Sequence, residues 1–152
     1  MSLESYYESL VKSYDQLRKA NENFLINNTG IDGFTNLVDM RAAILDDIEI
    51  LHDDLLCELA TLKANIDYDS MSLIELIREL PMLYPQLLPY KNKVIEALEN
   101  LVKSENNVAE NAKDERDDLK KQLVHARTGQ QTLNAYKPLT GYNGSHFIDS
   151  KK

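Results

Sequence analysis

Apolar residues recur at helical spacing along most of the chain. Between about Ser2 and Leu25 the steps alternate between four and three residues, which lines one face of a helix. The stripe consists of Leu3, Tyr7, Leu10, Tyr14, Leu17 and Phe24. Asn21 is the one polar residue of this stripe, and a buried Asn at such a position would fix the register or the oligomeric state. We favour instead a partly exposed Asn near the end of this helix.

A second helix follows a predicted turn. Asn and Gly are frequent between Asn27 and Gly33, and both residue types tolerate positive φ. The pattern then predicts a helix from about Phe34 to Ile66, on the order of 45 Å long. Its apolar stripe runs through Leu37, Ile44, Ile48, Leu51, Leu55, Leu59 and Leu62. Cys57 lies within this pattern, and we expect it to be a small buried hydrophobic residue.

A short helix comes next. Ser72 is a good N-cap, and Glu75 three residues later completes a capping box. We expect the helix to run from Leu73 to Leu80 and to stop at Pro81.

The last predicted helix is the longest. It begins between Tyr84 and Tyr90, runs to about Thr128 and stops near Gly129. Its apolar stripe is dense up to Val102, thins among many charges, and resumes at Leu119.

Together these elements predict an all-α fold. Long antiparallel helices form a helical hairpin or bundle, with one short connecting helix. Residues 130–152 have no periodicity, so they are expected to form a flexible C-terminal tail. The predicted domains are a helical bundle over 1–129 and the tail over 130–152.

The net charge of the chain disfavours two classes of function. The 152 residues carry a formal net charge of −8, with basic residues scattered among more numerous acids. A nucleic-acid-binding protein needs a basic face, and so does a protein that binds anionic membranes, so both classes are disfavoured. The chain also lacks an apolar run of membrane-spanning length and the features of a signal peptide, so we expect a cytoplasmic protein.

Candidate catalytic and metal-binding groups are incomplete. Glu49 and His52 have the Glu-x-x-His spacing of di-iron bundles, but no second pair accompanies them. Ser145, His146 and Asp149 are the residue types of a catalytic triad, yet they lie together on the predicted tail, without a scaffold. We therefore expect no enzyme activity, no cofactor and no metal.

Three segments carry a family resemblance. They are Gly33-Phe-Thr-Asn-Leu-Val-Asp-Met-Arg-Ala-Ala-Ile-Leu45, then Ser72-Leu-Ile-Glu-Leu-Ile-Arg-Glu-Leu-Pro81, and finally Tyr136-Lys-Pro with Gly144-Ser-His-Phe-Ile-Asp149. In this order they resemble the FlgN family of flagellar export chaperones. The chain departs from that family between Ser104 and Ala112, where small or polar residues stand in place of leucines.

The resemblance implies a cytoplasmic chaperone. It would bind and mask the amphipathic terminal helix of flagellar hook-filament junction (hook-associated) proteins before type III export. A contact with the export apparatus is left open. The predicted partner face lies on the last helix and the tail, at Val94, Leu98, Leu101, Val102, Val108, Ala109, Leu119, Leu123, Tyr136, Tyr142 and Phe147. The alternative is a coiled-coil scaffold or self-associating helical protein without cargo, so a homo-oligomer also remains open.

Overall fold

The structure, a computed structural model, describes residues 1–27 and 30–136, with side chains up to residue 130. It divides into two compact units, Met1–Ala109 and Glu110–Lys152. The α-helices are α1 (Leu3–Asn27), α2 (Gly30–Leu62), α3 (Leu73–Leu83) and α4 (Leu88–Tyr136), with short 3-10 turns at Tyr68–Ser70 and Pro85–Leu87. The described residues contain no strand, and the predicted all-α fold of long helices with one short helix is confirmed.

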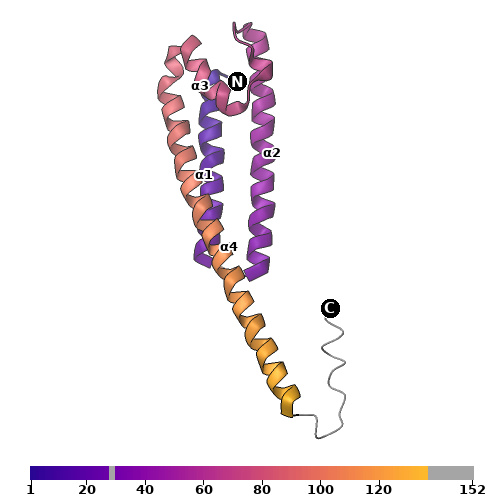
Figure 1. Cartoon of the computed structure of the whole chain (residues 1–152). Helices are drawn as coiled ribbons and strands as arrows, with labels where there is room; N and C mark the ends of the chain where they lie inside the picture. The colour runs from indigo at the N-terminus through magenta and orange to yellow at the C-terminus, as the bar shows by residue number, and fades with distance from the viewer. Residues whose placement is uncertain (28–29, 137–152) are drawn as a thin grey trace. The chain divides into compact units, whose positions relative to one another are not determined.

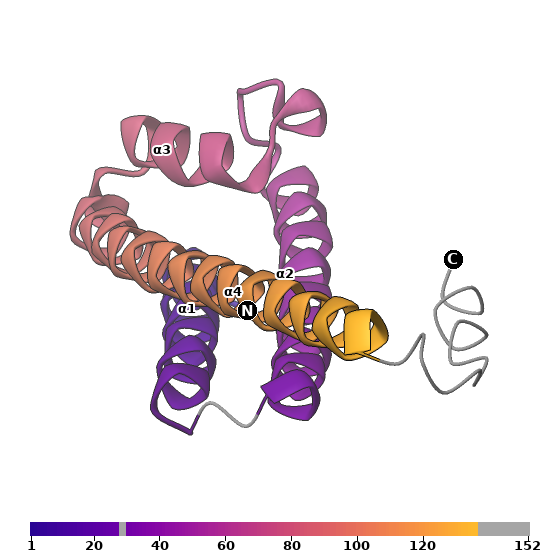
Figure 2. The same ribbon diagram turned by 60° about the horizontal axis from the view of Figure 1, so that its bottom comes forward.

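In the first unit, α1 and α2 lie side by side with opposite chain directions (Figure 1). The first part of α4 packs against this pair, and α3 crosses one end between the end of α2 and the start of α4 (Figure 2). The main core contains the α1 stripe from Leu3 to Leu17 together with residues from the other three helices. Its most buried members include Tyr7, Leu10, Leu55, Leu59, Leu76, Leu80, Leu87 and Val94.

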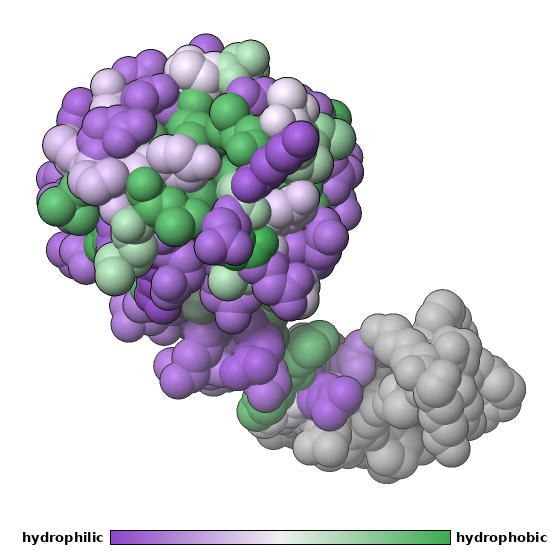
Figure 3. Space-filling view, turned by 90° about the horizontal axis from the view of Figure 1, so that it is seen from above, coloured by the Kyte–Doolittle hydropathy of each residue, from purple (hydrophilic) through white to green (hydrophobic). Residues whose placement is uncertain are grey.

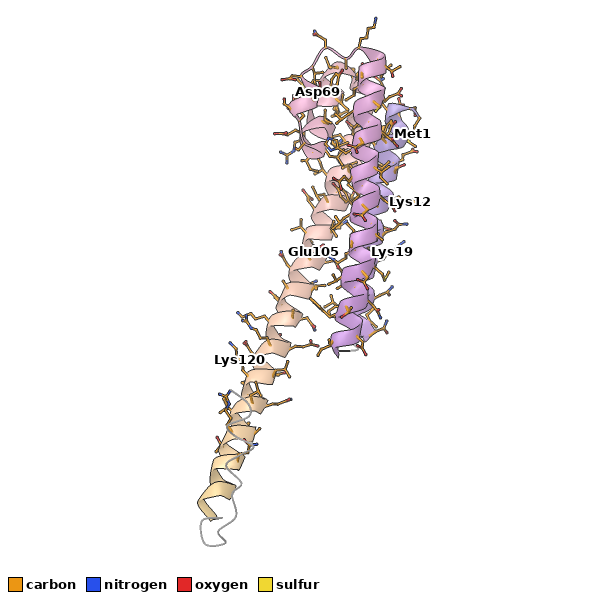
Figure 4. The ribbon with its side chains drawn as sticks, turned by 90° about the vertical axis from the view of Figure 1, so that its right-hand side faces the viewer. Met1, Lys12, Lys19, Asp69, Glu105 and Lys120 are labelled. Carbon is orange, nitrogen blue, oxygen red and sulfur yellow. The ribbon has the colours of Figure 1, made fainter. Side chains whose placement is uncertain are left out.

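A polar layer interrupts this core near the end of α1. Asn21 has no exposed surface, and its side-chain amide donates a hydrogen bond to Ser104 Oγ at 3.0 Å. Arg41 of α2 donates to Asn21 Oδ1 at 3.0 Å and also pairs with Glu105, which lies on the side of α4 towards α2 (Figure 4). A second, smaller apolar cluster follows beyond this layer, around Phe24. The expectation of a partly exposed Asn21 is therefore wrong, because two other helices, α2 and α4, supply partners for its amide.

The bounds of α1 and α2 differ from the prediction. α1 reaches Asn27 and α2 begins at Gly30, so Gly33 lies inside a helix. A single glycine inside a helix costs only about 1 kcal/mol relative to alanine, so it does not have to end one. Gly30 itself has φ 73°, a conformation that glycine adopts at little cost.

α2 ends four residues earlier than predicted, at Leu62. Lys63 adopts φ 51°, and its N–H donates to the carbonyl of Ala60 at 3.2 Å. The N–H of Ala64 donates to the carbonyl of Leu59 at 3.1 Å. These two bonds and the left-handed residue form a Schellman motif, which closes the helix.

Cys57 of α2 is exposed, so the prediction that it is buried is wrong. Leu55 and Leu59 take the buried positions on this turn. A residue midway between two positions four apart points to the opposite side of the helix. Cys57 therefore faces outward.

α3 begins as predicted but does not stop at Pro81. Glu75 N donates to Ser72 Oγ at 3.3 Å and Ser72 N donates to Glu75 Oε2 at 2.7 Å, which confirms the capping box. The helix continues to Leu83. Pro81 has no N–H for the carbonyl four residues before it, that of Ile77. The buried hydroxyl of Tyr7 donates to this carbonyl instead, at 3.0 Å.

α4 passes Gly129 and ends at Tyr136, so the predicted helix end is also wrong. No neighbouring atom crowds the Gly129 position, and a lone glycine is tolerated inside a helix. Residues 137–152, which make up most of the predicted tail, lie outside the described residues. None of the helices described is long and apolar enough to cross a membrane.

Candidate partner-binding groove

An apolar groove of about 400 Å³ lies between α3 and α4 in the first unit. Its lining comes from both helices, in the order Ile74, Ile77, Arg78, Ile95, Leu98, Glu99, Val102 and Lys103. Five of these residues are aliphatic. Their spacing along α4, at 95, 98 and 102, is that of one helix face. The groove is open to solvent, since Val102 retains 50% exposure.

The position of α3 defines this groove. Leu76, Leu80 and Pro81 are buried and anchor one side of α3 in the core. On the other side of α3, next to α4, Ile74 is half-buried and Arg78 is exposed. Lys91 of α4 adds a tether, because its amino group donates to the backbone carbonyl of Arg78 at 3.3 Å.

Three residues of the predicted partner face are core residues. Val94, Leu101 and Val108 are 1%, 7% and 8% exposed, and they pack inside the first unit. Their side chains are not available to a partner in this structure. They recur every seven residues on the side of α4 that meets the other helices of the unit, which accounts for their burial.

Leu98 and Val102, in contrast, line the groove. Ala109 is exposed, and in the second unit Leu119 and Leu123 are both 57% exposed. Tyr136 ends α4 but its side chain is not among those described, while Tyr142 and Phe147 lie outside the described residues. The partner face predicted from the sequence lacked Ile74 and Ile95, whereas Ile77, which also borders the groove, is 2% exposed and belongs to the core. The i, i+3 spacing of Ile74 and Ile77 within the Ser72–Pro81 segment was the available signal.

A larger and more polar trough of about 720 Å³ runs between α1 and α4. Its walls carry four acids and four bases, namely Glu8, Asp15, Glu22, Glu96, Lys12, Arg18, Lys93 and Lys103. Several of these charges compensate one another within α1, where Arg18 pairs with Asp15 and Glu22. Hydrogen bonds from Lys19 and Arg18 lower the pKa of Asp15. The lining of this trough is therefore far more charged than that of the α3–α4 groove.

Hydrophobic side chains are also exposed where α3 leads into α4. Figure 3 looks onto the end of the first unit that carries α3 and shows hydrophobic atoms scattered among hydrophilic ones. Met82, Leu83 and Leu88 are 78%, 42% and 51% exposed. None of these three residues lines the α3–α4 groove.

The candidate metal pair does not gain further ligands. Among the described residues, no group of three His, Cys, Asp or Glu side chains is placed to hold a metal ion. The His52 Nε2 atom is buried and has no hydrogen-bond partner. Ser145, His146 and Asp149 lie outside the described residues.

Comparisons with known proteins give no match: no protein-family model, no curated protein and no solved structure corresponds to this chain. The three sequence segments alone therefore carry the resemblance to the FlgN family.

Proposed function

We propose that this protein is a cytoplasmic export chaperone of the FlgN type, which binds the amphipathic terminal helix of a flagellar hook-filament junction protein. The bound helix would stay masked until type III export. One observation carries the proposal: the open apolar groove between α3 and α4. It joins two of the predicted partner-face residues, Leu98 and Val102, to the Ser72–Pro81 segment on which the resemblance rests.

The volume of the groove suits a few large side chains of a bound helix. Pockets of 300–1,000 Å³ hold small ligands or a few large side chains, and this groove of about 400 Å³ lies in that range. An amphipathic helix inserts side chains spaced three and four residues apart into such a groove. Each leucine-sized side chain that becomes fully buried contributes roughly 1.5–3 kcal/mol. Two or three such anchors give an appreciable driving force before the cost of association is subtracted.

Calorimetric titration of the full chain tests the proposal, with the C-terminal helical segment of a hook-filament junction protein from the same organism as the probe. We expect saturable binding near one-to-one. Val102→Glu should weaken binding at least tenfold, because it places a charge in the apolar groove. Val124→Glu is the matched control, since Val124 lies on the same helix, is 60% exposed and belongs to the second unit.

Circular dichroism must show that both variants keep the helicity of the unmodified protein. Equal binding by the two variants would exclude the groove as the cargo site. Absence of binding by the folded, unmodified protein to any such segment would contradict the proposed function.

The alternative function is self-association as a helical scaffold. It is favoured by Leu119 and Leu123, which are exposed together on the second unit. Light scattering during size-exclusion chromatography distinguishes the two functions. A tight oligomer that Leu119→Glu dissociates, in a protein without cargo binding, would favour the scaffold.

A further inference from the structure

We propose that the helix bound in the α3–α4 groove is acidic, with carboxylates flanking its apolar stripe. This inference rests on the proposed function and specifies the partner by its chemistry. The groove has an apolar floor and a charged rim, and the rim determines which polar residues can border the bound stripe. That rim consists of Arg78 on the α3 side and of Glu99 and Lys103 on the α4 side.

Neither Arg78 nor Lys103 forms an ion pair with any residue in the described part of the chain. In the same part of the chain, Arg18 and Arg41 do pair with carboxylates. The side chain of Arg78 is exposed beside the groove, so a ligand there can reach it.

Glu99 would repel the carboxylates of an acidic ligand, although it lies close to a basic residue on the same helix. It stands four residues before Lys103 on α4, a spacing at which opposite charges on a helix attract each other. Arg78 stands three residues after Glu75, whose carboxylate accepts a hydrogen bond from Ser72 N in the capping box and forms no ion pair with Arg78. Two of the three charged residues that line the groove are basic and one is acidic, so the rim presents a net positive charge.

The charge of the remainder of the protein would favour a basic ligand instead. The chain has a net charge of −8, and α2 alone carries eight acids against the single base Arg41. Long-range attraction to such a protein would favour a basic peptide. At contact distance, however, complementarity between neighbouring charges determines specificity, and unlike charges farther away are screened by salt. The two expectations differ in sign, so one experiment separates them.

Two synthetic helical peptides provide the test. They share one leucine stripe at helical spacing and differ only in the flanking residues, which are all glutamate in one and all lysine in the other. Fluorescence anisotropy measures the binding of each to the full-length protein at low and at high salt. We expect the glutamate peptide to bind at least fivefold more tightly, which is the effect of about one well-placed ion pair.

Arg78→Glu should abolish or invert this preference. Arg116→Glu is the matched control, because it makes the same charge change at an exposed position of the second unit. It should leave the preference unchanged. High salt should reduce the preference without removing the binding that the leucines provide.

Tighter binding of the lysine peptide to the unmodified protein would overturn the inference, as would an Arg78→Glu variant with unchanged preference. If both peptides bind and Val102→Glu abolishes both, the groove assignment stands whichever peptide is preferred. If neither peptide binds the folded protein, the groove itself fails as a helix-binding site. The failure of this inference is thus distinguishable from the failure of the proposed function.

Discussion

The Tyr7 hydroxyl donates a hydrogen bond to a helix carbonyl that Pro81 leaves without its usual donor. Tyr7→Phe tests how much this hydrogen bond stabilises the protein. This hydroxyl donates to the Ile77 carbonyl of α3 at 3.0 Å, in a buried position. The N–H that would normally serve this carbonyl belongs to the residue four ahead, which is Pro81. Phenylalanine keeps the ring packing and removes only the donor.

The expected loss of stability follows from two contributions. The net value of one hydrogen bond is about 0.5–1.5 kcal/mol, and a buried carbonyl left without a donor costs about 1–3 kcal/mol. Both figures describe the loss of the same hydrogen bond, so they are not added together. We expect Tyr7→Phe to destabilise the protein by about 2 kcal/mol. Urea unfolding followed by circular dichroism measures this value, and the slope with denaturant should not change.

Tyr6→Phe is the matched control. The Tyr6 hydroxyl donates to the Asp54 carbonyl of α2 at 3.2 Å, in a partly buried position. Asp54 lies inside α2 and has a normal N–H donor four residues later, at Glu58. Its carbonyl remains satisfied without Tyr6, so we expect a loss of about 0.5 kcal/mol.

A double-mutant cycle isolates the role of the proline. Pro81→Ala restores an N–H that can donate to the Ile77 carbonyl. In that background Tyr7→Phe should cost about 1 kcal/mol less than in the unmodified protein. The same cost in both backgrounds, or equal effects of Tyr6→Phe and Tyr7→Phe, would refute the substitution of a hydroxyl for the missing donor.

Three further predictions concern the helix ends and the polar layer. Lys63→Gly should stabilise the protein by about 0.5–1 kcal/mol in chemical denaturation, because Lys63 has φ 51°; destabilisation would contradict this role. Asn21→Ala should destabilise it by about 2 kcal/mol, and a cycle with Ser104→Ala should show coupling, since their side chains are 3.0 Å apart. Hydrogen bonds from the Ser72 backbone and side chain lower the pKa of Glu75 below 4.5. The carboxylate of Glu75 should therefore stabilise α3 above about pH 4.5 and lose this effect as the pH falls through its folded-state pKa. The stability difference from Glu75→Ala should be constant between pH 5 and 7 and shrink below pH 4.5; the opposite trend would contradict the capping role.

Local pattern was sufficient for the existence and type of the helices. The heptad spacing of α1 placed Tyr7, Leu10 and Leu17 on one face, and all three are buried. The capping box at Ser72 and Glu75 was predicted from a spacing of three residues and is present. These features depend on residues within one or two turns of each other, so the sequence contains the information needed to predict them.

Features that depend on a partner from another helix were not predictable in this way. Pro81 does not end α3 because Tyr7, 74 residues earlier, supplies a donor. Asn21 is buried because Ser104 and Arg41 supply hydrogen bonds from two other helices. In each case a rule based on local sequence gave the wrong prediction, because a tertiary contact stabilised an arrangement that the rule treats as unfavourable.

The apolar stripe of α4 shows the same division. Periodicity identified the helix and placed its apolar residues on neighbouring positions, which the sequence by itself determines. It did not separate Val94 and Leu101, which are buried, from Val102, which is half exposed in the groove. That separation depends on where α1, α2 and α3 lie around α4, because burial is a property of what packs against a face and not of the face alone.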